Sequence, residues 1–232
     1  VGTAEMHTDA GAVPASDLDE AGAIGLAAFG LRQSAEFIKA KENRPLAGEL
    51  WDNDSSDTPM CDRHGIDEGA DTAGVLLAAE AHTATSARLN GSVAVGIVIV
   101  SGPTADLQFS EDERRKVVAE VQNGLSWLGS QNSGGHVSWH YDIRPVNITA
   151  AVNGDAESVW RDPAMVALGF TGSWQGVWDY IKDLRTRLNT DWTYCAFFTK
   201  YPVTHFAYAS LGGPRLVMQY ANDNWGPDNI DR

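Results

Sequence analysis

The sequence has few cysteines, few basic residues and no long apolar run, and each shortage excludes a class of protein. Only Cys61 and Cys195 occur, and no Cys-x-x-Cys pair is present, which excludes a thiolate zinc site and a dithiol redox centre. The longest apolar run, residues 93–100, is far shorter than the roughly 20 residues that a membrane span needs. We therefore expect no membrane span.

Basic residues are outnumbered by acidic ones, 17 against 31, which gives a net charge of −14. A field of that sign repels phosphate backbones, so we expect no nucleic-acid partner. An acidic surface favours solubility and is common in proteins that work outside cells, so we expect a secreted, extracellular protein. Most of the excess charge falls in residues 1–90, which we interpret as an acidic, mainly helical N-terminal segment.

Within that segment, small polar residues predict a flexible leader over 1–16. Asp17 and Glu20 have the spacing of a capping box, which predicts a helix running to about residue 41, and a second helix is predicted over 70–89. Residues 50–72 begin like a calcium loop, but Arg63 stands where an EF-hand needs its closing Glu, so an EF-hand is excluded. A looser calcium site and a solvated acidic loop are the two alternatives left.

The pattern sharpens from residue 91 onward. Residues 93–100 are apolar on both faces, which predicts a buried strand. Ser110 and Glu113 form a capping box ahead of apolar residues at helical spacing, and strict alternation over 136–143 predicts a second strand. Because one helix connects the two strands, we expect a parallel βαβ unit.

The remainder predicts two helices and three strands. Asp162 with Pro163, and then Ser173, have the chemistry of helix starts. Strands are expected over 192–198, 205–209 and 215–220, with the last two joined as a hairpin. The predicted fold class is α/β, a twisted mixed sheet with a βαβ unit, a C-terminal antiparallel edge hairpin, helices packed on the sheet and an N-terminal helical segment.

Several short motifs near the end carry a resemblance. They are Asp-Trp-Thr-Tyr at 191–194, Thr-Lys-Tyr-Pro at 199–202, His-Phe-Ala-Tyr-Ala at 205–209 and Gly-Pro-Arg-Leu-Val-Met-Gln-Tyr at 213–220. With the element order of residues 93–232, they resemble the N-terminal subdomain of a little-characterised group of metzincin-like zinc metallopeptidases. The resemblance implies a hydrolase of peptide bonds that uses zinc.

In that group, a stretch similar to Trp-Gly-Pro-Asp-Asn-Ile-Asp-Arg at 225–232 leads into a helix with His-Glu-x-x-His. The two His hold zinc and the Glu deprotonates its water. This motif occurs nowhere in the sequence, so we assign no catalytic residue and no metal ligand, and leave open whether the chain is an enzyme. We expect residues 91–232 to be a metallopeptidase-like α/β domain without its zinc-ligand helix, the N-terminal portion of a protein that hydrolyses peptide bonds only if a zinc-binding segment completes it. Either a second polypeptide carries that helix, or the helix is disordered, or the protein kept the scaffold and lost the reaction.

The resemblance assigns substrate alignment to this portion, through an exposed edge strand that pairs antiparallel with an extended peptide. We predict that residues 215–220 form that strand, with a plain closing hairpin as the alternative. The candidate substrate-binding residues are Arg215, Val217, Met218, Gln219, Tyr220 and Trp225.

A non-catalytic binding module, lectin-like or protein-binding, is the second hypothesis. Trp51, Trp160, Trp174 and Trp225 lie near predicted loops or helix caps, where an indole can stack on a glycan ring, pin a loop or anchor a partner. Two other features are weaker. His136 and His140 share a strand face but lie too far apart, about 13 Å, to bind one metal readily. Cys195 lies in an apolar strand, which favours a buried free thiol over a disulfide.

Overall fold

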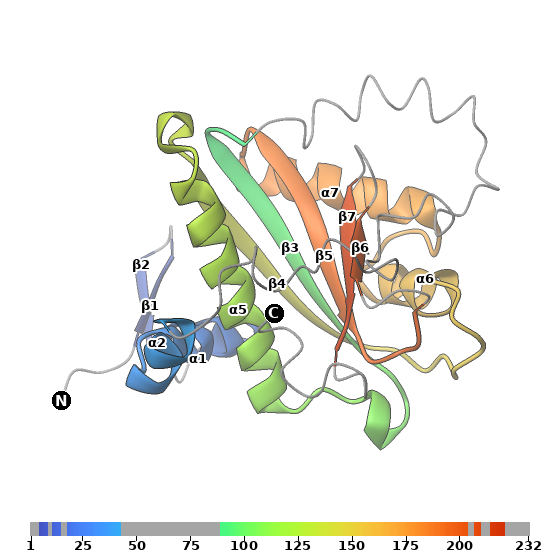
Figure 1. Ribbon diagram of the computed structural model, residues 1–232. Coiled ribbons are helices and arrows are strands. Elements are labelled where there is room, and N and C mark those ends of the chain that lie inside the picture. The colour runs from blue at the N-terminus through green and yellow to red at the C-terminus, as the bar shows by residue number, and fades with distance from the viewer. Residues whose placement is uncertain are drawn as a thin grey trace, which may run out of the picture.

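The computed structural model describes residues 5–8, 11–14, 18–42, 89–203, 207–209 and 214–220. Its centre is a five-stranded sheet in the order β4-β3-β5-β7-β6 (Figure 1). The strands are β3 (Ser92–Ser101), β4 (Ser138–Asn147), β5 (Trp192–Thr199), β6 (Ala207–Ala209) and β7 (Arg215–Gln219). The first four in the order are parallel and β6 is antiparallel to β7. The predicted α/β class, the βαβ unit and the antiparallel edge hairpin are confirmed.

Helices cover both faces of this sheet. On one face lie α5 (Glu111–Ser130), which connects β3 to β4, and α1 (Glu20–Arg32) with α2 (Ala35–Glu42). On the other face lie α6 (Ser158–Ala167) and α7 (Trp174–Leu188). Short 3-10 turns at Ala105–Leu107 and Ser133–Gly135 join the elements. None of the helices in the described ranges is long and apolar enough to cross a membrane.

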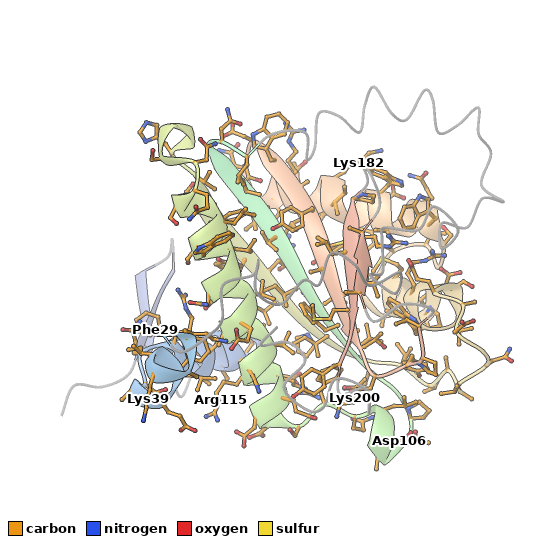
Figure 2. All side chains as sticks on the ribbon, in the orientation of Figure 1. Phe29, Lys39, Asp106, Arg115, Lys182 and Lys200 are labelled. Atoms are coloured by element: carbon orange, nitrogen blue, oxygen red, sulfur yellow. The ribbon has the colours of Figure 1, made fainter. Side chains whose placement is uncertain are left out.

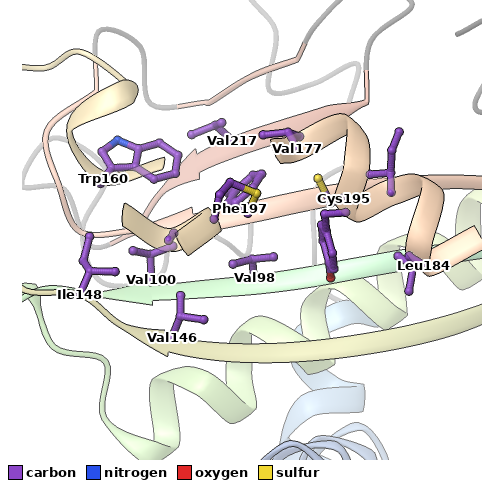
Figure 3. Close-up of a cluster of buried hydrophobic side chains, with 14 of the residues drawn as sticks. Val98, Val100, Val146, Ile148, Trp160, Val177, Leu184, Cys195, Phe197 and Val217 are labelled. Carbon is purple, nitrogen blue, oxygen red and sulfur yellow. The ribbon is translucent and has the colours of Figure 1, made fainter. Parts of the chain in front are cut away.

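Strand alternation divides the core into two clusters. Val98 and Val100 of β3 and Phe197 of β5 pack with Trp160 and Val177 on the α6–α7 side (Figure 3). The intervening residues of the same strands pack beneath α5 and α1. Burying β3 on both faces explains why its sequence is a continuous apolar run, because helices cover a parallel sheet on each side.

One glycine of this core leaves room for a tyrosine hydroxyl. Gly96 lies at the middle of β3, and a Cβ there would overlap the hydroxyl of Tyr180 from α7. That hydroxyl donates to Asp142 Oδ2 at 2.9 Å. Burial alone would raise the pKa of Asp142, but Arg144 and Arg187 outweigh it and hold the pKa of this carboxyl below its ordinary value. The gap at Gly96 therefore lets a buried phenol tie α7 to strand β4.

Local signals predicted some helix boundaries and missed others. The capping box of Ser110 and Glu113 is formed as expected. The single helix expected over 17–41 is instead two, because the Ser34 hydroxyl accepts the Phe37 N–H and caps a second helix, and the first helix is capped by Asp19. The helix expected to begin at Asp162 begins at Ser158, so Pro163 lies inside it.

The second strand was predicted slightly early. It covers 138–147 instead of 136–143. The main-chain N–H groups of Ser138 and Ile148 donate to carbonyls at the two ends of β3. The main-chain N–H and C=O groups of even-numbered residues in β4 therefore point toward β3, and those of odd-numbered residues point away from the sheet. Pro145, which has no N–H, is thus at an outward position of an edge strand, where the missing donor costs nothing.

The N-terminal segment is partly described. A hairpin of β1 (Glu5–Thr8) and β2 (Gly11–Pro14) occurs where we predicted a flexible leader. Ile24, Ala28 and Phe37 of α1 and α2 share the core cluster of α5. Residues 50–72 and the helix predicted over 70–89 fall outside the described residues.

Candidate functional site

The predicted peptide-binding strand, residues 215–220, is not at the edge of the sheet. Its strand, β7, pairs parallel with β5 on one side and antiparallel with β6 on the other. The prediction was wrong because β7, although last in sequence, is inserted between two earlier strands. The edge strand at this end of the sheet is β6, residues Ala207–Ala209.

Alternation along β7 places the described candidate side chains on opposite faces of the sheet. Arg215 and Val217 face α6 and α7 and are only 3% and 1% exposed. Met218 faces the α5 side and is partly buried. The main chain of Gln219 pairs with Thr199, and Trp225 lies outside the described residues. The candidates therefore do not form one surface.

Arg215 takes part in a buried ionic cluster instead of facing a substrate. Its guanidinium donates through two nitrogens to the Glu157 carboxylate, with Nε 3.1 Å from Oε1. Arg161 donates to the same Oε1 at 3.2 Å. Both guanidiniums also lie over the Trp174 ring, 5.0 Å from its centroid for Arg215 and 5.4 Å for Arg161. The cluster anchors β7 to α6 and the start of α7.

The α5 side of the same strands is apolar and incompletely covered. The antiparallel pairing of β6 with β7 places Ala207 opposite Met218 and Ala209 opposite Leu216 on this face. Leu216 is 42% exposed although it is apolar. Tyr194 of β5 lies on the same face and is half-buried. We call these five residues the open strip; it lies beside α5, which covers β3 and β4 (Figure 1).

A polar anchor borders the open strip at the carboxyl end of the strands. Lys200, labelled in Figure 2, donates to the Glu113 carboxylate at 2.7 Å and to the Gln108 carbonyl at 2.9 Å. Partial burial would raise the pKa of Glu113, but the hydrogen bonds from Lys200 and Ser110 outweigh it and hold that pKa below its ordinary value. This contact ties the end of β5 to the first turn of α5.

Tyr220 packs against Lys200 and Phe109 at the same polar anchor. Its N–H donates to the Thr199 carbonyl at 2.7 Å, and its ring centroid is 5.1 Å from that of Phe109. The Lys200 ammonium lies 5.4 Å from the centroid of the Tyr220 ring and 5.2 Å from that of Phe109. The chain therefore leaves β7 at a defined point, beside the start of α5 and at one end of the open strip.

The described residues do not assemble a metal site. Across 18–42, 89–203 and the two short stretches after them, no group of three His, Cys, Asp or Glu side chains could hold a metal ion. His136 and His140 are both exposed. The nearby Asp142 carboxylate accepts hydrogen bonds from Tyr180, Arg144 and Arg187. Zinc does not fit the residues seen here, and any zinc ligands would have to come from elsewhere.

Of the four tryptophans proposed for glycan contact, two lie within the described residues. Trp160 is fully buried, and Trp174 packs against the Arg161 and Arg215 guanidiniums. Both belong to the core and its border, which leaves only Trp51 and Trp225, outside the described residues. Cys195 is a buried free thiol, and burial raises its pKa.

Sequence reasoning overlooked β6 as the edge and Glu157 as the partner of Arg215. The order of strands in a sheet depends on long-range packing, and Glu157 lies 58 residues before Arg215, so no local pattern signals either. β6 is only three residues long, and very short strands are typical of sheet edges. No protein-family model, curated protein or solved structure matches the chain.

Proposed function

We propose that these residues form the substrate-aligning portion of a secreted zinc metallopeptidase of the metzincin-like kind. In this proposal the chain supplies the sheet that orients an extended peptide. The zinc ligands and the catalytic base come from a segment outside the described residues, carried by the same protein or by a second polypeptide. The described residues bind and position, and the zinc-bearing segment supplies the hydrolysis of the peptide bond.

The observation that carries the proposal is the edge strand β6. It is the one strand of the sheet antiparallel to its neighbour, and it pairs on one side only with β7. Its other side faces no described strand, so main-chain N–H and C=O groups there can pair with an extended peptide. The element order from β3 through α5, β4, α6 and α7 to the three last strands agrees with the order that the resemblance implies.

The open strip supports the second half of the proposal. An apolar sheet face gains free energy when another element covers it. An amphipathic helix lying beside α5 would bury Leu216, Met218 and Tyr194. A zinc-ligand helix in that place would lie directly behind β6. A peptide aligned on β6 would then pass close to the metal.

The first experiment measures zinc and hydrolysis in the native protein, together with any polypeptide that copurifies with it. We expect a bound zinc ion, cleavage of a peptide library, and loss of cleavage on chelation. If a second polypeptide copurifies with the protein, its sequence should contain His-Glu-x-x-His. Native protein that holds no zinc, cleaves nothing and binds glycans on an array would overturn the proposal in favour of the lectin-like alternative.

The second experiment tests the open strip. Leu216→Glu places a carboxylate where the proposed helix packs, and burying an unpaired charge costs several kcal/mol. We expect zinc retention to fall by more than about tenfold, since about 1.4 kcal/mol corresponds to tenfold. Val166→Glu is the matched control, because Val166 is 61% exposed on α6. Equal effects of the two substitutions on zinc retention would show that the open strip does not pack against the zinc-bearing helix.

The third experiment tests β6 through the backbone of the ligand. A cleaved peptide from the library is compared with two sets of copies, one N-methylated at odd-numbered peptide positions and the other at even-numbered positions. N-methylation removes main-chain donors without changing side chains, so one of the two alternating sets should weaken binding strongly and the other weakly. Equal binding of both sets would contradict pairing along an edge strand.

A further inference from the structure

The sequence contains three Asn-x-Ser/Thr sequons, beginning at Asn53, Asn90 and Asn147. Such a sequon accepts an N-linked glycan when its asparagine amide and its hydroxyl are both accessible on the surface. The structure describes the second and the third. Their surroundings differ enough to separate them.

The sequon at Asn90 is already engaged in the fold. Asn90 Oδ1 accepts the indole N–H of Trp192 at 3.0 Å. The Ser92 hydroxyl donates to Asp191 Oδ2 at 2.8 Å and accepts the Asp191 N–H at 2.9 Å. Between them, Gly91 has a φ of 67°, and a Cβ there would overlap the Asp191 carboxylate. These contacts join the start of β3 to the start of β5 and occupy the hydroxyl that a sequon must present.

The sequon at Asn147 is open. Asn147, the last residue of β4, and Thr149 are both exposed, and neither side chain hydrogen-bonds to another described residue. Ile148 between them is 5% exposed and its N–H donates to the Ser101 carbonyl at 2.9 Å. A buried, hydrogen-bonded centre with exposed residues on both sides presents the Asn147 amide and the Thr149 hydroxyl to solvent together.

We propose that Asn147 is an N-glycosylation site of this protein; the inference rests on the secreted location proposed above. The donor is an oligosaccharide linked through a diphosphate to a lipid. The bond from the anomeric carbon of its first sugar to the phosphate oxygen breaks, and a bond from that carbon to Asn147 Nδ2 forms. The amide loses one proton and the lipid diphosphate leaves.

A glycan at this position has a structural consequence. Odd-numbered residues of β4 point their main-chain groups away from β3, and Asn147 is the last of them. The edge of β4 is thus open toward solvent near Pro145 and Asn147 within the described part of the chain. Unpaired edges promote association between chains, and bulky or proline-containing ends reduce it. The glycan would shield the end of β4 that is opposite to the peptide-binding edge β6.

The test is expression of residues 1–232 behind a secretion signal in a eukaryotic host, followed by glycopeptide mass spectrometry. We expect Asn147 to be occupied and Asn90 to be largely unmodified. Thr149→Ala should abolish the modification while keeping the asparagine, and Thr149→Ser should retain it. In an Asn53→Gln background, Asn147→Gln should remove the glycosidase-sensitive gel shift, and Asn90→Gln should leave it in place.

The outcomes separate this inference from the proposed function. An unmodified Asn147 in secreted, folded protein would overturn it, as would occupancy of Asn90 with Asn147 empty. Because the host supplies secretion, neither result depends on zinc or hydrolysis. The metallopeptidase proposal can therefore fail while Asn147 is glycosylated, and the reverse.

Discussion

The buried cluster around Glu157 predicts an asymmetry between two substitutions that look equivalent. Glu157 is shared by Arg215 and Arg161, and the three side chains are 8%, 3% and 4% exposed. Glu157→Gln removes the carboxylate that both guanidiniums contact, whereas Arg161 keeps Asp162 at 2.8 Å. Removing one partner of a buried pair costs about 3–5 kcal/mol, and we expect a loss of that size.

Arg215→Met should cost less. Glu157 keeps its ion pair with Arg161, and the methionine side chain fills the space beside the Trp174 ring. The expected loss is about 1.5–3 kcal/mol, the value of a hydrogen bond to a charged group. The double variant should lose less than the sum of the two single losses, because the residues share one cluster.

Urea unfolding followed by tryptophan fluorescence measures these free energies. Asp183→Asn is the control, because Asp183 and Arg187 form a half-exposed pair of 3.4 Å, for which about 0–1 kcal/mol is expected. The reasoning would be refuted if Arg215→Met destabilised as much as Glu157→Gln, or if neither exceeded the control. Weaker peptide binding by Arg215→Met at unchanged stability would restore the substrate-binding role predicted from sequence.

Three further predictions concern the core and the anchor. Gly96→Ala should lower the free energy of unfolding by about 1–3 kcal/mol, because the new methyl group overpacks the core. Gly124→Ala is the control: no atom lies near the new Cβ on the helix surface, so it should raise the free energy of unfolding by up to about 1 kcal/mol. Thermal melts of the two variants measure the difference. The pKa of Glu113 is lowered in the folded state, so its contribution to stability is present above its ordinary value of 4.5 and is lost as pH falls through the folded value. Lys200→Met should therefore destabilise most at neutral pH, and urea titrations at several pH values that gave a constant difference would contradict this. In a variant without the other cysteine, Cys195 should resist a thiol reagent until denaturant unfolds the chain; rapid labelling in buffer would show that it is accessible.

Much of the fold could be predicted from local chemistry. The capping box of Ser110 and Glu113 satisfies the first N–H groups of α5 from within four residues. The apolar run of β3 indicates burial on both faces, and a single crossover helix between β3 and β4 indicates parallel strands. These signals depend on neighbours in sequence, so they can be read before any tertiary contact is known.

The errors share one cause, which is contact between distant residues. The helix expected at Asp162 begins earlier, and Glu157 and Arg161 at its start join Arg215 of β7. The strand predicted as the edge became an inner strand because β6, which precedes it, folded back to its outer side. A hairpin pattern reveals that two strands pair, but it does not reveal which of them will also pair with β5.

By itself, the sequence determined the kinds and the order of the elements from β3 onward, and the parallel unit of β3, α5 and β4. The tertiary structure alone decided the strand order, and therefore that β6 forms the edge, that Arg215 is buried against Glu157 and that Leu216 lies in an open strip. The physical reason is that helix caps and strand alternation act between neighbours in the chain. The position of a strand within a sheet follows from which faces and backbone edges are satisfied together in three dimensions.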